Sequence, residues 1–305
     1  MANELDLRDL RYFEAIAEAG HLGRAAAKLH RSQPALTSCV RRLEAAVGTA
    51  LFERVGRGIR LTAAGEALAR RALALRLAAD DAVREIGEVG AGLAGTVRIG
   101  VLPTLARFLM PPLCRVFLAD APGVRIQPLI AQNDVLAERL ESGEADFILT
   151  TVSRASEEYE SHRVLEDEAV VIASRNHPVL RKRKAKLEDL LAYPWVLAPP
   201  SVGTRQWLDK VFETRGLPLP AVQIETNLIL MMPTLIRETD LLTFTSRRHT
   251  ARQGGDSDLR EVPLAETTMR RRFAVMYRRA GYLSPAAMKL IALMRSRGRE
   301  LFAED

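Results

Sequence analysis

Residues 32–44, SQPALTSCVRRLE, place hydroxyl, amide and guanidinium groups beside an apolar series with helical spacing. Ser32 suits the N-cap of a helix, and Pro34 falls in the first turn, where its missing N–H costs nothing. Thr37, Ser38 and Arg41 lie opposite the apolar stripe and can hydrogen-bond to a partner. The stripe predicted to be buried consists of Leu36, Val40, Leu43 and Val47.

Basic residues concentrate around this segment. Residues 21–60 hold eight Lys or Arg against two Glu, a net +6 that equals the charge of the whole chain. Such a field attracts a polyanion, and a duplex is the common one, whereas a solvated basic face without a ligand is the alternative. The eight cations are Arg24, Lys28, Arg31, Arg41, Arg42, Arg54, Arg57 and Arg60.

Two shorter elements must hold the polar helix in place. The apolar periodicity predicts a helix over residues 7–19, stopped by Gly20, and a second over about 22–29, where three alanines allow close helix packing. A tight polar turn then leads to the helix at 32–44. This order is that of a helix-turn-helix, whose later helix enters a major groove.

The next stretch, LFERVGRGIRLT at 51–62, predicts two short strands around a Gly-x-Gly turn. Arg54 and Arg57 lie at or near its tip, where they can reach phosphates or a narrow minor groove. The alternative is an exposed basic hairpin without a ligand. We interpret residues 1–62 as a mainly α winged helix-turn-helix domain that binds DNA.

A long helix follows, in which small or apolar residues alternate spacings of 4 and 3. This period predicts a coiled-coil dimerisation helix over 63–90, and a helix packed only on its own domain is the alternative. The glycine-rich stretch at 87–96 ends the helix and places a hinge at 91–95. The expected seam is Leu61, Gly65, Leu68, Ala72, Leu75, Ala79, Ala82, Ile86 and Val89.

Beyond the hinge, strands alternate with helices, which predicts an α/β domain over 96–305 with a largely parallel sheet. We expect two lobes, lobe I at about 96–165 and 266–305 and lobe II at about 166–265. A last helix from Ser284 belongs to lobe I. The expected strands are 97–101, 124–130, 146–150, 169–174, 195–198, 222–226, 240–246 and 272–279.

Four strand-to-helix turns carry groups suited to a small ligand in a crevice between two such lobes. Hydroxyls and free backbone N–H groups at helix starts fit an anionic or hydroxylated molecule. The alternative for each turn is a simple helix N-cap. The candidate effector-binding residues are Pro103, Thr104, Asn133, Thr150, Thr151, Ser201, Val202, Gly203 and Thr204.

Several classes of protein are excluded by what the sequence lacks. It has no apolar window long enough to span a membrane, and its N-terminus is acidic and polar. Cys39 and Cys114 lie far apart, so we expect no disulfide framework and a cytoplasmic location, with Cys39 a half-buried packing residue. No histidine or cysteine has metal-ligand spacing, and no phosphate loop, nucleophile elbow or dinucleotide fingerprint occurs. We expect no metal, no cofactor and no catalysis.

Residues 7–66, LRDLRYFEAIAEAGHLGRAAAKLHRSQPALTSCVRRLEAAVGTALFERVGRGIRLTAAGE, closely resemble the DNA-binding region of LysR-type transcriptional regulators. The long helix, the hinge and the two lobes are similar to that family, as are SVGT, MPPL and SGEADFIL. The resemblance implies a homo-oligomer, a dimer or tetramer, that binds promoter DNA. It also implies that lobes with a type 2 periplasmic-binding-protein fold sense a small effector, such as an aromatic or sugar acid.

The resemblance assigns the DNA contacts by position. Arg24 and Arg31, which lie in the basic window at residues 21–60, are two further candidate DNA-binding residues. Many relatives carry a basic residue at Ser38, and some carry Arg at Thr151, so a carboxylate in this cleft would be left to hydroxyls and N–H groups. The matched residues are Ser32, Gln33, Pro34, Thr37, Ser38 and Arg41 of the helix and Arg54 and Arg57 of the wing.

Our hypothesis is therefore an effector-responsive, sequence-specific DNA-binding regulator. A non-specific architectural DNA binder would leave residues 96–305 unexplained. A two-domain metabolite-binding enzyme with an accessory DNA-binding module would explain the crevice, but the chain shows no nucleophile, metal set or cofactor loop for it.

Overall fold

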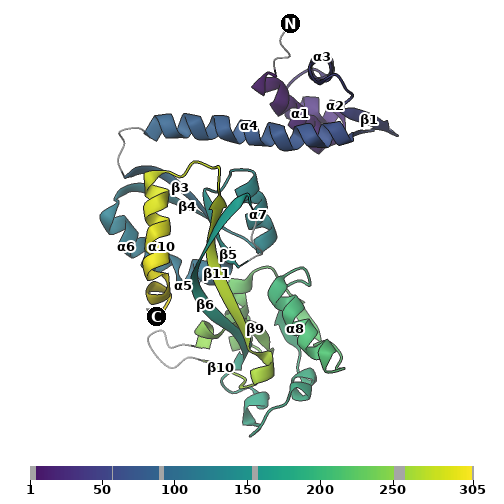
Figure 1. Ribbon diagram of the computed structural model, residues 1–305. Helices are drawn as coiled ribbons and strands as arrows, with labels where there is room; N and C mark the ends of the chain where they lie inside the picture. The colour runs from purple at the N-terminus through teal and green to yellow at the C-terminus, as the bar shows by residue number, and fades with distance from the viewer. Residues whose placement is uncertain (1–4, 57, 89–92, 153–156, 251–257, 304–305) are drawn as a thin grey trace. The chain divides into compact units, whose positions relative to one another are not determined.

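The computed structural model describes residues 5–56, 58–88, 93–152, 157–250 and 258–303 (Figure 1). The chain forms two compact units, residues 1–89 and residues 90–305. Each unit has its own hydrophobic core.

The first unit begins with three helices, α1 (Leu7–Ala19), α2 (Leu22–Lys28) and α3 (Gln33–Val47). Asp6 caps α1 by accepting the Arg8 N–H at 2.7 Å, and Ser32 caps α3 by accepting the Ala35 N–H at 3.4 Å. Helix α1 ends at Gly20, whose φ of +60° is the left-handed conformation that glycine adopts without strain. The three helices form the expected helix-turn-helix arrangement.

The buried side of α3 differs from the expected stripe. Leu36 and Leu43 are buried, but Cys39 is also fully buried, while Val47 is 39% exposed. The reason is that α3 packs into two clusters at once. Leu36 joins the cluster around Ala25 and Ala26 of α2. Cys39 and Leu43 join the cluster that contains Leu10, Phe13, Leu51, Leu68 and Ala72.

The wing and the long helix complete this unit. Strands β1 (Phe52–Val55) and β2 (Gly58–Leu61) pair antiparallel, and α4 spans Ala63–Glu88. Leu61, expected in the helical seam, belongs to β2 instead. Helix α4 packs against α1 through Leu68 and Ala72, and it leaves Leu75, Val83 and Ile86 exposed.

In the second unit, lobe I surrounds a core built on parallel strands. Strand β3 pairs parallel with both β4 and β5. Ala94 and Gly95, expected in the hinge, already belong to β3, and residues 91 and 92 lie outside the described part. The elements of lobe I are β3 (Ala94–Val101), α5 (Pro103–Phe108), α6 (Met110–Asp120), β4 (Gly123–Ile130), α7 (Asn133–Glu141), β5 (Phe147–Thr151) and α10 (Pro285–Ala303).

Lobe II has a second core, formed around buried Trp195, Phe212 and Leu242. Strands β7 and β8 pair parallel, whereas β9 and β10 pair antiparallel with a strand shared between the lobes. Its helices and strands are β7 (Trp195–Leu197), α8 (Gly203–Thr214), β8 (Val222–Glu225), α9 (Met232–Arg237), β9 (Thr243–Ser246) and β10 (Leu259–Glu261). Its 3-10 turns are η1 (Pro178–Arg181), η2 (Leu187–Ala192), η3 (Ile229–Met231), η4 (Arg247–Thr250) and η5 (Ala265–Thr267).

Two long antiparallel strands, β6 (Tyr159–Ser174) and β11 (Met269–Arg278), run side by side through both lobes (Figure 1). They correct the expectation of a largely parallel sheet, because the sheet order β10-β6-β11-β5-β3-β4 is antiparallel on the β6 and β11 side. On β6, Leu165 packs in the core of lobe I and Ala169 in that of lobe II. On β11, Phe273 packs in lobe I and Met269 against the core of lobe II.

Three pairs of opposite charge lie on β6 and β11 where these two strands pass from the core of lobe I to the core of lobe II. Glu166, Asp167 and Glu168 of β6 lie opposite Arg272, Arg271 and Arg270 of β11. We call these six residues the ionic ladder.

No helix among the described residues is long and apolar enough to cross a membrane.

Gly65 gives a test of the packing of the first unit. A Cβ at this position would lie 2.1 Å from the backbone oxygen of Leu51, which cannot move without disturbing the wing. Gly65→Ala is therefore expected to destabilise the protein by about 1–3 kcal/mol, although alanine favours helices. Urea unfolding followed by circular dichroism measures this change.

Gly87→Ala on the same helix is the matched control, because a Cβ there meets nothing within 4 Å. It should be neutral or slightly stabilising. If Gly65→Ala unfolded at the same urea concentration as Gly87→Ala, the close approach of α4 to Leu51 would be wrong.

Candidate functional site

The expected DNA-reading side of α3 is exposed. Arg31, Gln33, Ser38 and Arg41 are all exposed, as are Ser32 and Pro34 at the start of the helix. Thr37 is half-buried and donates its hydroxyl to the Gln33 carbonyl at 3.1 Å. The exposed face therefore offers amide and guanidinium groups to a partner. The Thr37 hydroxyl already donates its hydrogen bond within the helix.

The cations of the basic window divide into two groups. Lys28 pairs with Glu18 at 2.8 Å, Arg60 pairs with Glu53, and Arg42 pairs with Asp9. The remaining ones face solvent without an acidic partner among the described residues, so their charge is available to a polyanion. They are Arg24, Arg31, Arg41 and Arg54. Arg57 lies outside the described part of the chain.

Arg24 and Arg42 have structural contacts that the sequence pattern did not indicate. Arg24 donates to the Ala19 carbonyl at 2.6 Å, which fixes it at the end of α1. Arg42 holds the buried Asp9 carboxylate with two hydrogen bonds, at 2.7 and 2.8 Å, and also donates to the Ser38 hydroxyl at 3.1 Å. Ser38 is thus oriented by its neighbour on the next turn.

Cys39 is a packing residue, as expected, but it is fully buried instead of half-buried. Its thiol donates to the Asp9 carbonyl at 3.4 Å. Burial raises the pKa of the Cys39 thiol to about 12, with the Asp9 carboxylate adding to the effect. A thiol with so little thiolate is poorly suited to redox chemistry.

In the second unit, a cavity of about 490 Å³ collects most of the expected effector-binding residues. Its wall includes the starts of α5, α7 and α8 and residues 269–273 of β11. An adjoining cavity of about 900 Å³ includes Ser201 and shares Asn133 and Gly203 with the first. The expected residues that line the smaller cavity are Pro103, Thr104, Asn133, Thr151, Val202, Gly203 and Thr204.

The helix starts at this cavity are not capped by side chains. Neither α5, α7 nor α8 has a side-chain hydrogen bond at its N-cap. The alternative of simple N-caps is therefore wrong at these turns. Their first backbone N–H groups, such as those of Asn133 and Gly203, have no partner within the helix and can bind a ligand. The Thr104 hydroxyl forms no hydrogen bond within the described residues.

Asn133 is held rigidly by the end of β5. Its amide nitrogen donates to the Thr151 hydroxyl at 3.1 Å, and its oxygen accepts from the Thr150 hydroxyl at 2.5 Å. Thr150 is buried and does not line the cavity, so it acts by positioning Asn133.

Sequence reasoning missed the wall that β11 supplies. Arg270, Arg271 and Arg272 all line the 490 Å³ cavity, and none of its lining residues in the described part of the chain is acidic. The signal that could have found them is the run of three arginines at 270–272 opposite the three acids at 166–168. Gln132, Ile229, Met269 and Phe273 complete the newly found lining.

Comparison with known families decides what this architecture belongs to. The model of the LysR substrate binding domain matches residues 90–299, more than half of the chain. The model of the bacterial regulatory helix-turn-helix protein, lysR family, matches residues 7–66. The chain belongs to the LysR family of transcriptional regulators.

Relatives of this LysR-type regulator are themselves named as transcriptional regulators. It is 31% identical over 240 residues to the HTH-type transcriptional regulator GbpR of Rhizobium radiobacter, covering 76% of this chain and 78% of the relative. It is also 31% identical over 296 residues to the HTH-type transcriptional regulator GalR of Pseudomonas putida, covering 94% and 73%.

Solved structures share the fold. A full-length OxyR variant from Pseudomonas aeruginosa matches with a TM-score of 0.65 at 22% identity, covering 98% of this chain and 96% of that one. Full-length CbnR complexed with its target DNA matches with a TM-score of 0.53 at 22% identity, covering 97% and 100%. The winged helix-turn-helix and the two α/β lobes are thus the architecture of LysR regulators.

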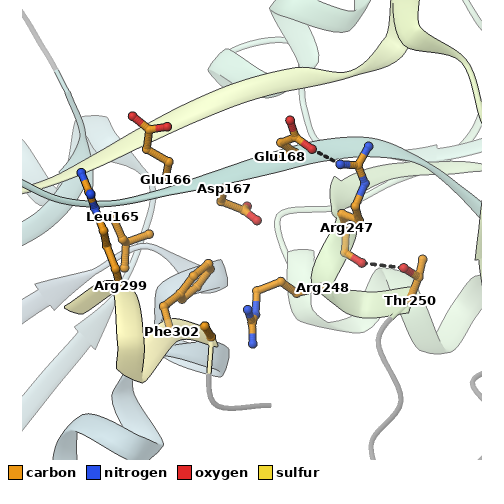
Figure 2. A pocket seen from close by; sticks show the side chains of 10 residues that line it. Leu165, Glu166, Asp167, Glu168, Arg247, Arg248, Thr250, Arg299 and Phe302 are labelled. Atoms are coloured by element: carbon orange, nitrogen blue, oxygen red, sulfur yellow. Dashed lines mark hydrogen bonds and ion pairs between the residues drawn. The ribbon is translucent and has the colours of Figure 1, made fainter. Parts of the chain in front are cut away.

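A third cavity of this LysR-type regulator, about 730 Å³, is lined by the three acids of the ionic ladder (Figure 2). Its charges are largely matched within the protein. Arg247 bonds to Glu168 and donates two hydrogen bonds, at 2.6 and 2.8 Å, to Glu261. The guanidinium carbon of Arg248 lies 4.5 Å from the centre of the Phe302 ring. We interpret this cavity as part of the contact between the lobes.

His249 of η4 packs against lobe I near that cavity. Its ring meets Phe108 edge-on, with centroids 4.9 Å apart. Burial lowers the pKa of His249 to about 3, and the charges of Arg107 and Arg271 add to the effect. His249 is therefore neutral at neutral pH.

The lowered pKa predicts a stability loss in mild acid. Below the ordinary pKa of 6.5, the unfolded chain takes up a proton at His249 that the folded protein excludes, so the free energy of unfolding falls as the pH drops from about 6.5 towards 3. His249→Gln should lose less stability between pH 7 and pH 5 than the wild type. Urea unfolding at each pH measures the difference, and equal losses in both proteins would contradict the assignment.

Proposed function

We propose that this LysR-type regulator reads promoter DNA with α3 and the wing, and that Arg31, Arg41 and Arg54 supply the main unpaired charge. The main support for this proposal is that some cations of residues 21–60 pair with acids, whereas others face solvent. Gln33 and Arg41 project from the start and middle of α3, where base edges are read in a major groove. Arg24 and the two wing arginines Arg54 and Arg57 contact phosphates in this proposal.

The division of the chain into a winged domain at 1–62, a linker helix at 63–90, a hinge at 91–95 and an effector domain at 96–305 is part of the same proposal. The exposed apolar residues of α4 support dimerisation. Leu75, Val83 and Ile86 are 46%, 73% and 73% exposed, although large aliphatic side chains favour burial. Leu75, Ala79, Ala82 and Ile86 form one stripe with spacings of 4, 3 and 4, the pattern that a second copy of the same helix covers, and Val83 is next to Ala82 in the sequence. Two such dimers make the tetramer that we propose.

The effector in this proposal occupies the cavity between the lobes. Uncapped helix starts and the Asn133, Thr104 and Thr151 side chains provide its polar contacts. A ligand that binds one arrangement of the lobes better than another shifts the population of the oligomer, and with it the spacing of the DNA-reading helices.

Substitution on α3 tests DNA reading. Purified protein should protect a site in its own upstream region in a footprint at moderate salt. Arg41→Ala and Gln33→Ala are each expected to weaken binding by roughly 5- to 150-fold, about 1–3 kcal/mol.

Lys28→Ala is the matched control for Arg41→Ala, because it removes one positive charge that Glu18 already neutralises. It should cost less than threefold, about 0.6 kcal/mol. Equal losses for Lys28→Ala and Arg41→Ala would argue against reading by α3.

A charge on the exposed stripe of α4 tests dimerisation. Ile86→Glu would bury a carboxylate in the proposed interface and should weaken self-association roughly 10- to 100-fold. Ala74→Glu, which adds the same charge at an exposed position on a different side of the helix, should leave it unchanged. Sedimentation velocity measures the oligomer, and an unchanged oligomer in Ile86→Glu would refute the interface.

A further inference from the structure

Resting on the proposed reading of promoter DNA by α3, we infer that Asp9 and Arg42 make Ser38 a residue that determines base specificity. Arg42 is a positioning residue, because it donates to the Ser38 oxygen and leaves the hydroxyl hydrogen free to face a base edge. In this role Ser38 requires a hydrogen-bond acceptor on the base. Guanine, adenine and thymine offer one in the major groove, and cytosine does not.

Asp9 anchors this arrangement from α1. It lies in the first turn of that helix, where the helix dipole favours a carboxylate, and it is only 4% exposed. Its backbone oxygen also accepts the Cys39 thiol at 3.4 Å, which ties the start of α1 to the middle of α3. The Asp9 carboxylate therefore has a fixed position relative to the DNA-reading helix.

Arg42 uses all three nitrogens of its guanidinium group. Nε and Nη2 donate to the two oxygens of Asp9 at 2.8 and 2.7 Å, the paired geometry that fixes a guanidinium relative to a carboxylate. Nη1 is left for α3 and donates to the Ser38 hydroxyl at 3.1 Å. Although the Arg42 side chain is 54% exposed, its orientation is thus set by the protein.

The contact with Arg42 decides how the Ser38 hydroxyl can be used. A serine hydroxyl has one hydrogen to donate and two lone pairs that accept, whereas arginine only donates. The Ser38 hydrogen therefore cannot bond to Arg42, and it has no acceptor among the described residues. The neighbouring Thr37 differs, because its hydroxyl donates to the Gln33 carbonyl. Since Ser38 is exposed, its hydrogen is available to a partner.

Accepting a hydrogen bond from a cation also changes the strength of the hydroxyl. Hydrogen bonds in a series polarise one another, so the Ser38 O–H becomes a stronger donor and its remaining lone pair a weaker acceptor. Guanine presents N7 and O6, adenine N7 and thymine O4 as acceptors, whereas cytosine presents the N4 amino donor. A serine without this contact pairs with either kind of edge. With Arg42 in place, Ser38 disfavours cytosine.

The charge of Arg42 is matched within the unit, which separates base preference from general attraction. Asp9 already neutralises this guanidinium, so Arg42 adds little to the sequence-independent binding of phosphates. The contribution of Asp9, Arg42 and Ser38 is therefore expected in the choice of base at one position. Overall affinity for DNA and its dependence on salt are expected to come from the exposed arginines.

Binding of the full-length protein to single-base variants of its operator tests the inference. The site protected in the footprint serves as the parent duplex, each base pair is replaced in turn by the other three, and fluorescence anisotropy gives the dissociation constants. The wild type should disfavour cytosine roughly three- to tenfold at one position of the half-site. Ser38→Ala removes only an exposed hydroxyl and should abolish the preference at that position alone.

Arg42→Lys separates positioning from charge. Lysine keeps a positive charge beside Asp9 but lacks the planar fork, so it cannot hold Asp9 and Ser38 at the same time. Discrimination against cytosine at the Ser38 position should fall to less than about twofold. Affinity for random-sequence DNA, and its salt dependence, should stay within about twofold of the wild type.

Arg11→Lys is the matched control. It makes the same substitution at an exposed arginine of α1, which pairs with Asp80 of α4 at 3.3 Å and does not contact α3. Its base preferences should equal those of the wild type. Loss of the cytosine discrimination in Arg11→Lys as well as in Arg42→Lys would overturn the positioning role.

The remaining outcomes are distinct from one another. Ser38→Ala that weakens binding to all duplexes equally would mark a phosphate contact and overturn the inference, as would Ser38→Ala with no effect on any duplex. Cytosine among the favoured bases at the Ser38 position, or an unchanged profile in Arg42→Lys, would also overturn it. In these cases the wild type still binds its operator specifically. A wild type without specific binding would instead overturn the proposed function.

Discussion

The ion pair between Asp167 and Arg271 is the constraint on which the effector domain depends. Both side chains are almost completely buried, at 3% and 8% exposure, and Ser246 donates a further hydrogen bond to Asp167 at 3.0 Å. A buried charge is tolerated only when it is paired and hydrogen-bonded. Any shift of β11 along β6 would therefore leave both charged groups buried without a partner. The pair therefore fixes the strand register at the place where one hydrophobic core ends and the other begins.

In the first unit, the pairing of charges determines which cations remain available to a partner. A basic window by itself says only that a polyanion is attracted. In the folded unit, Asp9, Glu18 and Glu53 neutralise three of the cations, and those acids lie on α1 and on the wing itself. The exposed cations that remain are a smaller set, namely Arg24 on α2, Arg31 before α3, Arg41 on α3 and Arg54 on the wing. Long-range attraction is reduced, while the charges that remain are those that we propose contact a duplex.

The sequence predicted the local elements well, because helical and strand periodicity are local properties. Helices α1 to α4 and strands such as β3 and β4 were expected close to their observed bounds. The first half of β6 was not expected, because its residues 159–168 are charged and half-exposed and lack an apolar pattern. Burial of Cys39 was missed because a single stripe was assumed for a helix that packs into two clusters.

The 490 Å³ cavity shows that local sequence patterns also miss residues that come together only in the folded domain. Thr104, Asn133 and Gly203 could be expected from the turns that carry them, since strand ends gather at one edge of an α/β sheet. Arg271 could not, because it becomes a wall residue only through pairing with a strand about 100 positions earlier. Register over such a separation is set by the completed fold and by the burial of both partners, and no local pattern encodes it.

The two strands that the lobes share, β6 and β11, also limit how the lobes can move. A flexible single-chain hinge would let two bodies separate, slide or rotate, but here both connections are strands hydrogen-bonded to each other along their length. Sliding would break the register and its buried ion pair, and stretching would break covalent geometry. Twisting changes the angle between paired strands only slightly at each residue, which sheets accommodate readily. The pairing of β6 with β11 therefore favours torsion about their common axis over sliding or separation of the lobes.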